Sequence, residues 1–462
     1  MHAALLNYIT AHRQRFLDEL FDWLRIPSVS AQPQHRPDMD RAAQWLADRL
    51  SELGPTTVEL LPTPGLPIVY AEFRVGPDAP TVLIYGHYDV QPAEPFELWE
   101  SPPFEPRLGL LGGEEKIFAR GACDDKGQVY MHVKATEALL RNGGLPCNLK
   151  FFIEGEEEVG SEHLAQAILD HKDRLACDVV LISDTAMIAN DHPSITVGLR
   201  GIAYMEVSVY GPNRDLHSGV YGGAVANPIN VLCELIAQLK DEQGRITIPG
   251  FYDAVEELSA EERAEMARIH FDLEAYKAAL NLPAVSGEAG YTTLERGSIR
   301  PTLDVNGIWG GYQGQGSKTV LPAEAHAKIS MRLVPNQDPA TVAQQFADYL
   351  RQLAPPTVRI EVRELHGGQP FVMPTGAPAY KAAEAALTQT YGTKPIPARE
   401  GGSIPIVATF ARELGVDVVL LGFGLNSDAL HSPNENFGTF NYFKGIESLA
   451  LFHHHLSAQP RA

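Results

Sequence analysis

The sequence predicts an α/β protein in which a domain with a mostly parallel sheet flanked by helices is interrupted by a smaller α+β domain. Toward both ends of the chain, short apolar runs typical of buried strands alternate with helical segments, which indicates parallel pairing. In the middle, apolar residues alternate with polar ones, as in half-exposed antiparallel strands. A length of 462 residues also favours two domains over one.

The first part of the chain has the pattern expected of the parallel domain. Apolar residues recur at nearly helical spacing over residues 1–25, and a second helix is expected at Met39–Leu53. Strands and helices then alternate into the C-terminal part. The expected strands are Thr81–Tyr85, Asn148–Ile153, Asp178–Ile182 and Val416–Leu421, and the helices between them are Val129–Leu140, Ser161–Lys172 and Pro378–Tyr391.

The middle segment has a period of two in Gly201–Tyr210 and in Ala323–Leu333, which predicts antiparallel strands. Two helices, Pro228–Lys240 and Pro339–Leu353, are expected to pack on them, and the charged segment Phe251–Leu280 is expected to be helical at the surface. The predicted domains are therefore residues 1–198 and 370–462 for the first domain, and 199–369 for the inserted one.

Composition excludes several classes of function. With 37 Lys and Arg against 58 Asp and Glu, the net charge is 37 − 58 = −21, which argues against nucleic acid and anionic membrane as partners. No apolar run is long enough to span a bilayer, and charges among the first 25 residues indicate an amphipathic helix instead of a signal peptide. Four widely spaced cysteines suit a reducing cytoplasm and give no thiolate metal site.

Two adjacent carboxylates, Asp124 and Asp125, lie between Gly121 and Gly127 and directly before a predicted helix. Negative charge is favoured at a helix N-terminus, so one interpretation of this turn is a helix cap. The other interpretation is a carboxylate that bridges two metal ions. The choice between them depends on the rest of the chain.

Potential metal ligands follow each of the four predicted strands of the larger domain. Taken singly, an acidic run is usually a solvated face, a lone histidine is usually structural, and an Asp after a strand is usually a turn residue. Ligands in open α/β sheets, however, bind beyond the carboxyl ends of the strands, and a mixture of imidazole and carboxylate suits a hydrolytic site with two cations. The residues after the strands are His87 and Asp89, then Glu154 to Glu158, then Asp184, and finally Asp428 and His431.

Five segments, in this order and spacing, resemble the metal motifs of a known family of co-catalytic di-metal aminopeptidases and carboxypeptidases. That family includes carnosine dipeptidases, aminoacylases, glutamate carboxypeptidases and succinyl-diaminopimelate desuccinylases. The resemblance extends from about residue 87 to residue 435. The segments are His87–Asp89, Ala119–Gly127, Glu154–Ser161, Ser183–Asp184 and Ala429–Glu435.

The resemblance implies a metal site with two ions and a role for each ligand. Asp124 is implied to bridge the ions, with His87 and Asp184 completing one site and Glu158 and His431 completing the other. Imidazole plus carboxylate suits zinc first, with manganese or cobalt as alternatives. A cis peptide bond after the bridging residue, at Asp124–Asp125, is also implied.

Two further residues receive catalytic roles from the same resemblance. Asp89 is implied to orient the imidazole of His87 by a hydrogen bond, which would fix its tautomer and ring angle. Glu157 is implied to be the general base that takes a proton from a water held between the metals and delivers it to the leaving amine. Two adjacent glutamates are needed because a base cannot also be a metal ligand.

The inserted domain resembles the family's lid and dimerisation domain, and its motifs are most similar to the dipeptidase branch. His217 is then implied to donate to the developing oxyanion in the partner's active site of a homodimer. Thr319 and Arg332 are implied to hold the substrate's terminal carboxylate, since the planar fork of Arg binds a carboxylate with two hydrogen bonds. Ser403 is expected to contact the same end and Glu400 the amine. The segment Met373–Tyr380 lacks the histidines found in carnosine-cleaving relatives, which argues against a carnosine preference.

The expected activity is therefore metal-dependent hydrolysis of dipeptides by a cytoplasmic homodimer, with a metal-bridging water activated by Glu157. One alternative is an N-acyl-amino-acid deacylase or desuccinylase on the same scaffold. Another is a binding protein without catalytic activity, but the retention of Glu157 and of all five ligands argues against it.

Overall fold

The computed structural model describes residues 2–269, 271–402 and 404–459, and the chain forms two compact units. The first unit consists of Met1–Val197, Met373–Ala398 and Thr409–Ala462. The second consists of Gly198–Val372 and Arg399–Ala408. The predicted α/β class is confirmed, and the functional roles expected of the two parts stay predictions.

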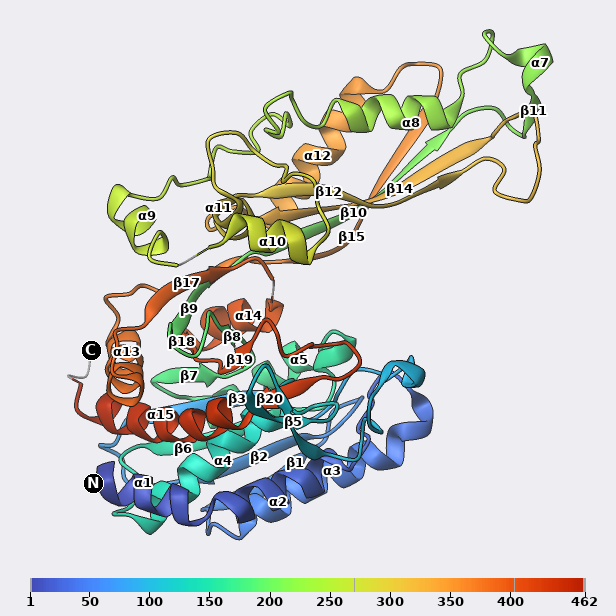
Figure 1. Cartoon of the computed structure of the whole chain (residues 1–462). Coiled ribbons are helices and arrows are strands. Elements are labelled where there is room, and N and C mark those ends of the chain that lie inside the picture. Colours follow the sequence, from blue (N-terminus) through green and yellow to red (C-terminus); the bar gives the residue numbers. More distant parts are fainter. Residues whose placement is uncertain (1, 270, 403, 460–462) are drawn as a thin grey trace. The chain divides into compact units, whose positions relative to one another are not determined.

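The first unit is built on a mixed sheet whose centre is parallel (Figure 1). Strand β3 pairs in parallel with β6 and β7, and β7 pairs in parallel with β18. Along the path β1-β2-β6-β3-β7-β18-β9-β16, only β2 and β9 run against the other strands. The strands are β1 (Thr57–Leu61), β2 (Ile68–Phe73), β3 (Thr81–His87), β6 (Asn148–Glu154), β7 (Val179–Ile182), β9 (Ser194–Leu199), β16 (Phe371–Val372), β18 (Asp417–Leu420) and β17 (Ile396–Glu400), which pairs with β9. Strand β16 and the last residues of β9 and β17 fall within the residue ranges of the second unit.

Helices cover both faces of this sheet, with α4 and α15 on one side and α5 and α14 on the other (Figure 1). Phe410 of α14 packs edge-on against Tyr85 of β3, with ring centroids 5.1 Å apart. Because both faces are covered, β6 and β7 are buried along their whole lengths, which explains the unbroken apolar sequence of β7 and the mainly apolar sequence of β6. The helices are α1 (His2–Ala11), α2 (Arg13–Leu24), α3 (Arg36–Ser51), α4 (Lys126–Arg141), α5 (Leu164–Asp170), α6 (Lys172–Leu175), α13 (Pro378–Tyr391), α14 (Pro405–Leu414) and α15 (Thr439–Ser457).

Small strands and turns complete the first unit at the edge that carries the site. Strands β4 (Arg107–Leu111), β5 (Glu114–Phe118) and β20 (Asn436–Gly438) form a three-stranded sheet, so that residues far apart in the sequence pair at β5 and β20. Strand β8 (Ala186–Met187) pairs with β19 (Gly424–Leu425). Short 3-10 turns lie at Pro33–His35, Phe96–Leu98 and Glu157–Val159.

The second unit is an antiparallel sheet in the order β12-β14-β10-β15, with α8 and α12 packed on one face (Figure 1). Buried and partly buried residues alternate along β14, as its period of two predicts. Side chains such as Val207, Ala327 and Phe346 form its core. The strands are β10 (Gly201–Tyr210), β11 (Leu216–His217), β12 (Thr302–Gly310), β13 (Val320–Leu321), β14 (Glu324–Leu333) and β15 (Arg359–Gly368).

The helices of the second unit are α7 (Ser218–Tyr221), α8 (Pro228–Ala237), α9 (Ala260–Met266), α10 (Leu273–Ala279), α11 (Thr293–Ser298) and α12 (Pro339–Leu353). Within the segment predicted to be helical, residues 251–280, the described residues therefore form two short helices, α9 and α10. Among the described residues of the whole chain, no helix combines the length and the hydropathy that a bilayer crossing requires.

Candidate metal centre

The site lies where the parallel strands of the first unit end. His87 is the last residue of β3 and pairs with Glu154, the last residue of β6. The chain then turns through Glu157 and Glu158, while Asp184 follows the end of β7. Parallel strands bring their carboxyl ends to one edge of the sheet, so this packing gathers side chains from distant parts of the sequence.

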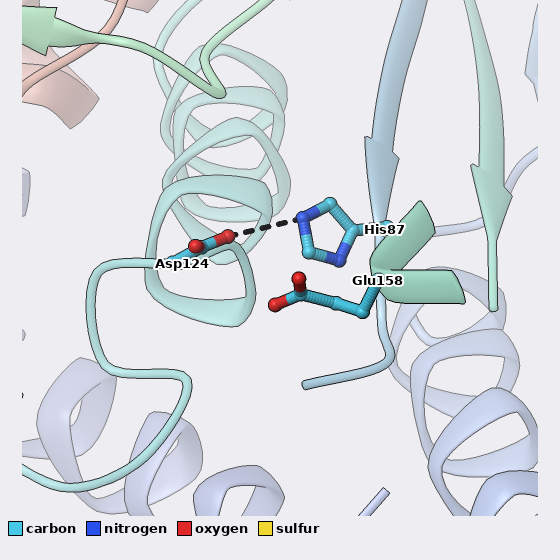
Figure 2. Close-up of side chains that lie close together, drawn as sticks. All are labelled: His87, Asp124 and Glu158. Carbon is cyan, nitrogen blue, oxygen red and sulfur yellow. Dashed lines mark hydrogen bonds and ion pairs between the residues drawn. The ribbon is translucent and has the colours of Figure 1, made fainter. Parts of the chain in front are cut away.

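Asp124 is the centre of the cluster, in the turn just before α4. Its two carboxylate oxygens face different imidazoles: Oδ1 lies 3.1 Å from Nε2 of His87, and Oδ2 lies 2.8 Å from Nε2 of His431. The peptide bond between Asp124 and Asp125 is cis. Figure 2 shows Asp124 and His87 joined by this contact, with the carboxylate of Glu158 directed toward the same space.

The remaining two expected ligands are Asp184 and Glu158. Asp184 lies near His87 on one side of Asp124, and Glu158 lies near His431 on the other. Oδ2 of Asp184 lies 3.9 Å from Nε2 of His87, and Oε2 of Glu158 lies 3.4 Å from Nε2 of His431. The ligand atoms of His87, Asp124 and Glu158 all lie within 4.8 Å of one another. The structure thus brings together all five residues for which the sequence predicts metal binding.

Electrostatics shows why this cluster suits cations. Burial raises the pKa of Glu158 to about 8, and the neighbouring Asp124 adds to the rise. Burial and then Asp125 hold the pKa of Asp184 well above its usual range. Burial would also raise the pKa of Asp124, but hydrogen bonds with His431 and His87 lower it instead. Carboxylates crowded in this way need positive charge nearby.

The two histidines meet that need when they are protonated. The hydrogen bond with Asp124 raises the pKa of His431 to about 9, although burial opposes the rise. Divalent cations would supply the same positive charge, and imidazole nitrogens and carboxylate oxygens are suitable ligands for zinc, manganese or cobalt. The donor set therefore fits two such ions, with His431, whose side chain is 55% exposed, on the open side.

Asp89 contacts two of the expected ligands, His87 and Glu158, and also Glu157. Nδ1 of His87 is 3.3 Å from Oδ1 of Asp89 and 3.1 Å from the backbone oxygen of the same residue. The carboxylate also accepts hydrogen bonds from the backbone N–H groups of Glu157 at 3.3 Å and Glu158 at 3.0 Å. Besides the imidazole contact expected from the sequence, Asp89 therefore anchors the turn that carries both glutamates.

Glu157 stands beside this cluster. Burial raises the pKa of Glu157, His87 counteracts the rise, and Asp124 and Asp89 add to it. A carboxylate whose pKa is raised toward neutrality is a better proton acceptor in catalysis than one at its ordinary pKa.

Two side chains near the site were missed by sequence reasoning. Gln91 donates to Oε2 of Glu158 at 2.7 Å, and Ser30 donates to Oδ2 of Asp89 at 2.7 Å. A neutral polar residue gives no pattern that distinguishes it in a sequence. The one signal that could have indicated Gln91 is its closeness to His87 along the chain.

The residues expected to bind the substrate belong to the second unit. His217 is exposed at the end of β11, where its Nδ1 accepts a 3.0 Å hydrogen bond from the N–H of Gly219. Thr319 is exposed, Arg332 is half-buried on β14, and Glu400 ends β17. Ser403 lies outside the described residues. The roles of all five stay predictions.

Comparison with known proteins agrees with this geometry. The model of "Peptidase family M20/M25/M40" matches residues 83–455. A Cys-Gly metallodipeptidase of Candida albicans is 35% identical over 98% of this chain and 96% of its own length. The human Beta-Ala-His dipeptidase is 33% identical over 97% of this chain and 91% of its own.

A solved structure of an M20 family metallo-carboxypeptidase from Sulfolobus solfataricus superposes with a TM-score of 0.83 at 33% identity, covering 96% of this chain and 99% of that one. The family resemblance predicted from the motifs is thus confirmed, and so is the class of enzyme, a metallopeptidase. The chain belongs to peptidase family M20/M25/M40.

Proposed function

We propose that the protein is a dipeptidase that hydrolyses the peptide bond with the help of two divalent cations sharing Asp124. The observation that carries the proposal is the placement of His87 and His431 at opposite oxygens of the Asp124 carboxylate. Asp184 on one side and Glu158 on the other provide a further ligand for each ion. The dipeptidase activities named for the yeast and human relatives support the choice of substrate.

The chemistry divides between the ions and the protein. Bound cations would polarise the scissile carbonyl and activate a water molecule, which are the usual contributions of a two-metal site. Glu157 takes the proton from that water and delivers it to the nitrogen of the leaving amine. Asp89 holds the backbone of Glu157 and Glu158, so the base and the ligand keep a fixed separation.

The second unit provides substrate recognition in this proposal. Arg332 and Thr319 bind the free C-terminal carboxylate of a dipeptide, with Ser403 at the same end and Glu400 near the amine. The half-buried position of Arg332 supports this role, because a partly desolvated guanidinium binds a carboxylate more strongly than an exposed one. His217 acts on the oxyanion of the partner's site in a homodimer formed through this unit.

Zinc is the proposed physiological metal, with manganese or cobalt as alternatives, because the donor set mixes two imidazoles with carboxylates. The proposed location is the cytoplasm. All four cysteines are free thiols, as a reducing compartment requires.

A second candidate activity is carboxypeptidase action on longer peptides, which the similarity to the Sulfolobus enzyme favours. It would use the same metals, base and carboxylate grip. It would differ only in what the site accepts on the N-terminal side of the scissile bond. Deacylation of N-acyl amino acids, the alternative raised by the sequence, would differ there too.

A substrate panel separates these activities. The metal-stripped protein, reloaded with zinc or manganese, is assayed with Cys-Gly, β-Ala-His, a dipeptide amide, a tripeptide and an N-acetyl amino acid. We expect cleavage of free dipeptides, loss of activity with chelator, and at least ~10-fold lower kcat/KM for the amide, since about 2–5 kcal/mol accompanies loss of a buried charge partner. Preference for the tripeptide or the N-acetyl amino acid, or activity without metal, would contradict the proposal.

A further inference from the structure

One buried carboxylate joins the loop that carries Asp124 to the loop that carries His431. Glu435 has no solvent exposure. Its Oε2 accepts hydrogen bonds from Nη1 of Arg120 at 2.7 Å and from the N–H of Gly121 at 3.0 Å. Its Oε1 accepts from the N–H groups of Cys123 at 3.0 Å and Asp124 at 3.2 Å.

Glu435 occupies the point where the two loops separate. Strands β5 and β20 pair so that Phe118 lies opposite Asn436, and the N–H of Ala119 donates to the backbone oxygen of Glu435 at 3.2 Å. Beyond this pairing, the segment that follows β5 continues from Ala119 through the next five residues to Asp124. In the segment that precedes β20, His431 lies four residues before Glu435. The carboxylate thus contacts the backbone of one loop while belonging to the other.

The loop before Glu435 has a strained backbone that needs such support. Ala429, His431 and Asn434 have φ angles of 56°, 56° and 64°, in the left-handed region. A residue with a side chain is destabilised in this conformation, because its Cβ comes too close to the following carbonyl oxygen. Conformations of this kind persist only where surrounding contacts determine them.

We propose that Glu435 is a positioning residue that fixes Asp124 relative to His431 and so sets the geometry of the shared carboxylate. The inference rests on the proposed two-metal function, and it concerns a residue to which the sequence motifs assigned no role. Four donors saturate the two oxygens of a carboxylate. An amide at this position would turn its NH2 group toward two of those donors, so only a carboxylate fits.

The contacts of Glu435 separate into two kinds, which makes the proposal testable. One contact is an ion pair with the side chain of Arg120, and three are hydrogen bonds from the backbone of the Asp124 loop. If Glu435 serves only as the counter-ion of Arg120, removal of either partner should have the same effect. If it positions Asp124, removal of Glu435 should affect metal binding much more than removal of Arg120.

A second buried ion pair provides a matched control. Nζ of Lys116, on β5, lies 3.1 Å from Oδ1 of Asp428, which is in the same loop as His431. This pair joins the same two chain segments with a similar contact. Lys116 lies on the strand itself, before the loop that leads to Asp124, so its removal tests the general cost of a lost buried pair.

The experiment compares Glu435→Gln, Glu435→Asp, Arg120→Met and Lys116→Met with the wild type. Metal ions per chain are counted after dialysis, zinc affinity is measured by chelator competition, and the Tm of each metal-free protein is recorded. We expect at least ~10-fold weaker zinc binding in both Glu435 variants, the scale for a residue that supports metal ligands. Arg120→Met and Lys116→Met should lower the Tm but retain two ions with affinity within about threefold of wild type.

Glu435→Asp keeps the charge for Arg120 while shortening the reach to the backbone, so it remains informative if Glu435→Gln does not fold. Zinc affinity of Glu435→Asp equal to wild type, or equal losses in Glu435→Gln and Arg120→Met, would overturn the inference while leaving the proposed function intact. A wild-type chain that binds fewer than two ions would instead contradict the proposed function, and the inference with it.

Discussion

The backbone N–H of Glu158 donates a 3.0 Å hydrogen bond to Oδ2 of Asp89. The other oxygen of the same carboxylate lies 3.3 Å from Nδ1 of His87. Asp89 therefore contacts one ligand of each proposed cation site. It contacts His87 through the imidazole and Glu158 through the backbone N–H. It also accepts from the N–H of Glu157, so the proposed base is held by the same group.

Replacement of Asp89 by Asn should lower kcat by about 10–100-fold, the range for lost support of metal ligands. Asn offers one acceptor oxygen, and its NH2 group would face the imidazole or a backbone N–H. Steady-state kinetics and metal content test this, with Ser30→Ala as control because that change removes only a hydroxyl donor to the same carboxylate. An Asn variant as active as Ser30→Ala would show that the carboxylate is dispensable.

Glu157→Gln should retain both metal ions and lose turnover by ~10²–10⁴-fold, the usual contribution of a positioned base. Glu156→Gln is the matched control, since its carboxylate lies in the same turn but contacts His163 at 2.8 Å. Metal analysis and kcat for both variants decide the assignment. Near-normal turnover of Glu157→Gln, or an equal loss in Glu156→Gln, would remove Glu157 from the role of base.

The proposed action of His217 on the partner's site predicts complementation between inactive subunits. A mixed dimer of a Glu157→Gln chain and a His217→Ala chain would have one site with both an intact base and an intact partner histidine. About a quarter to a half of wild-type activity should then appear after mixing and reassembly. Absence of rescue in a purified mixed dimer, or full activity of a monomer, would exclude action in trans.

The stability that His132 and His453 contribute to the metal-free protein should be lost as the pH decreases below 6.5. Burial lowers the pKa of both His132 and His453 to about 3, and His453 further lowers that of His132. Between pH 6.5 and about 3 these two histidines therefore bind protons in the unfolded chain that they do not bind in the folded chain, so their titration favours unfolding. The raised pKa of Glu158 has the opposite effect. Each histidine contributes up to about 1.4 kcal/mol per pH unit in this window.

Urea unfolding at pH 5.0 and 6.5, in the presence of chelator, tests this prediction. His453→Leu removes one of the two groups, so on going from pH 6.5 to 5.0 its free energy of unfolding should decrease less, or increase more, than that of the wild type. Identical changes in variant and wild type would mean that His453 is protonated in the folded protein.

Much of the fold could be predicted where the local pattern reports the tertiary environment. The helix Pro378–Tyr391 has the predicted bounds, because Pro378 suits its first turn and Gly392, with φ of 74°, ends it. The strands β3 and β6 were recognised from short, mainly apolar runs. In contrast, α15 was missed because it is buried on nearly all sides and has no apolar face to give a helical period.

The site, like the fold, could be predicted from the sequence only in part. Ligands at strand ends follow from the rule that parallel strands present their carboxyl ends together, and the family motifs implied their pairing. The contacts of Glu435 with Cys123 and Asp124 join residues more than 300 positions apart. Such contacts depend on how two loops meet in space, and no local period or spacing encodes that.

The most direct test of the account is the number of metal ions bound per chain in Asp124→Ala and Asp184→Ala, measured by elemental analysis after dialysis against zinc. Each oxygen of Asp124 faces one histidine, whereas Oδ2 of Asp184 lies 3.9 Å from Nε2 of His87. We predict two ions in the wild type, close to one in Asp184→Ala, and fewer than one in Asp124→Ala. An Asp124→Ala chain that retains two ions would contradict the shared carboxylate and leave Asp124 as a residue of the turn before α4.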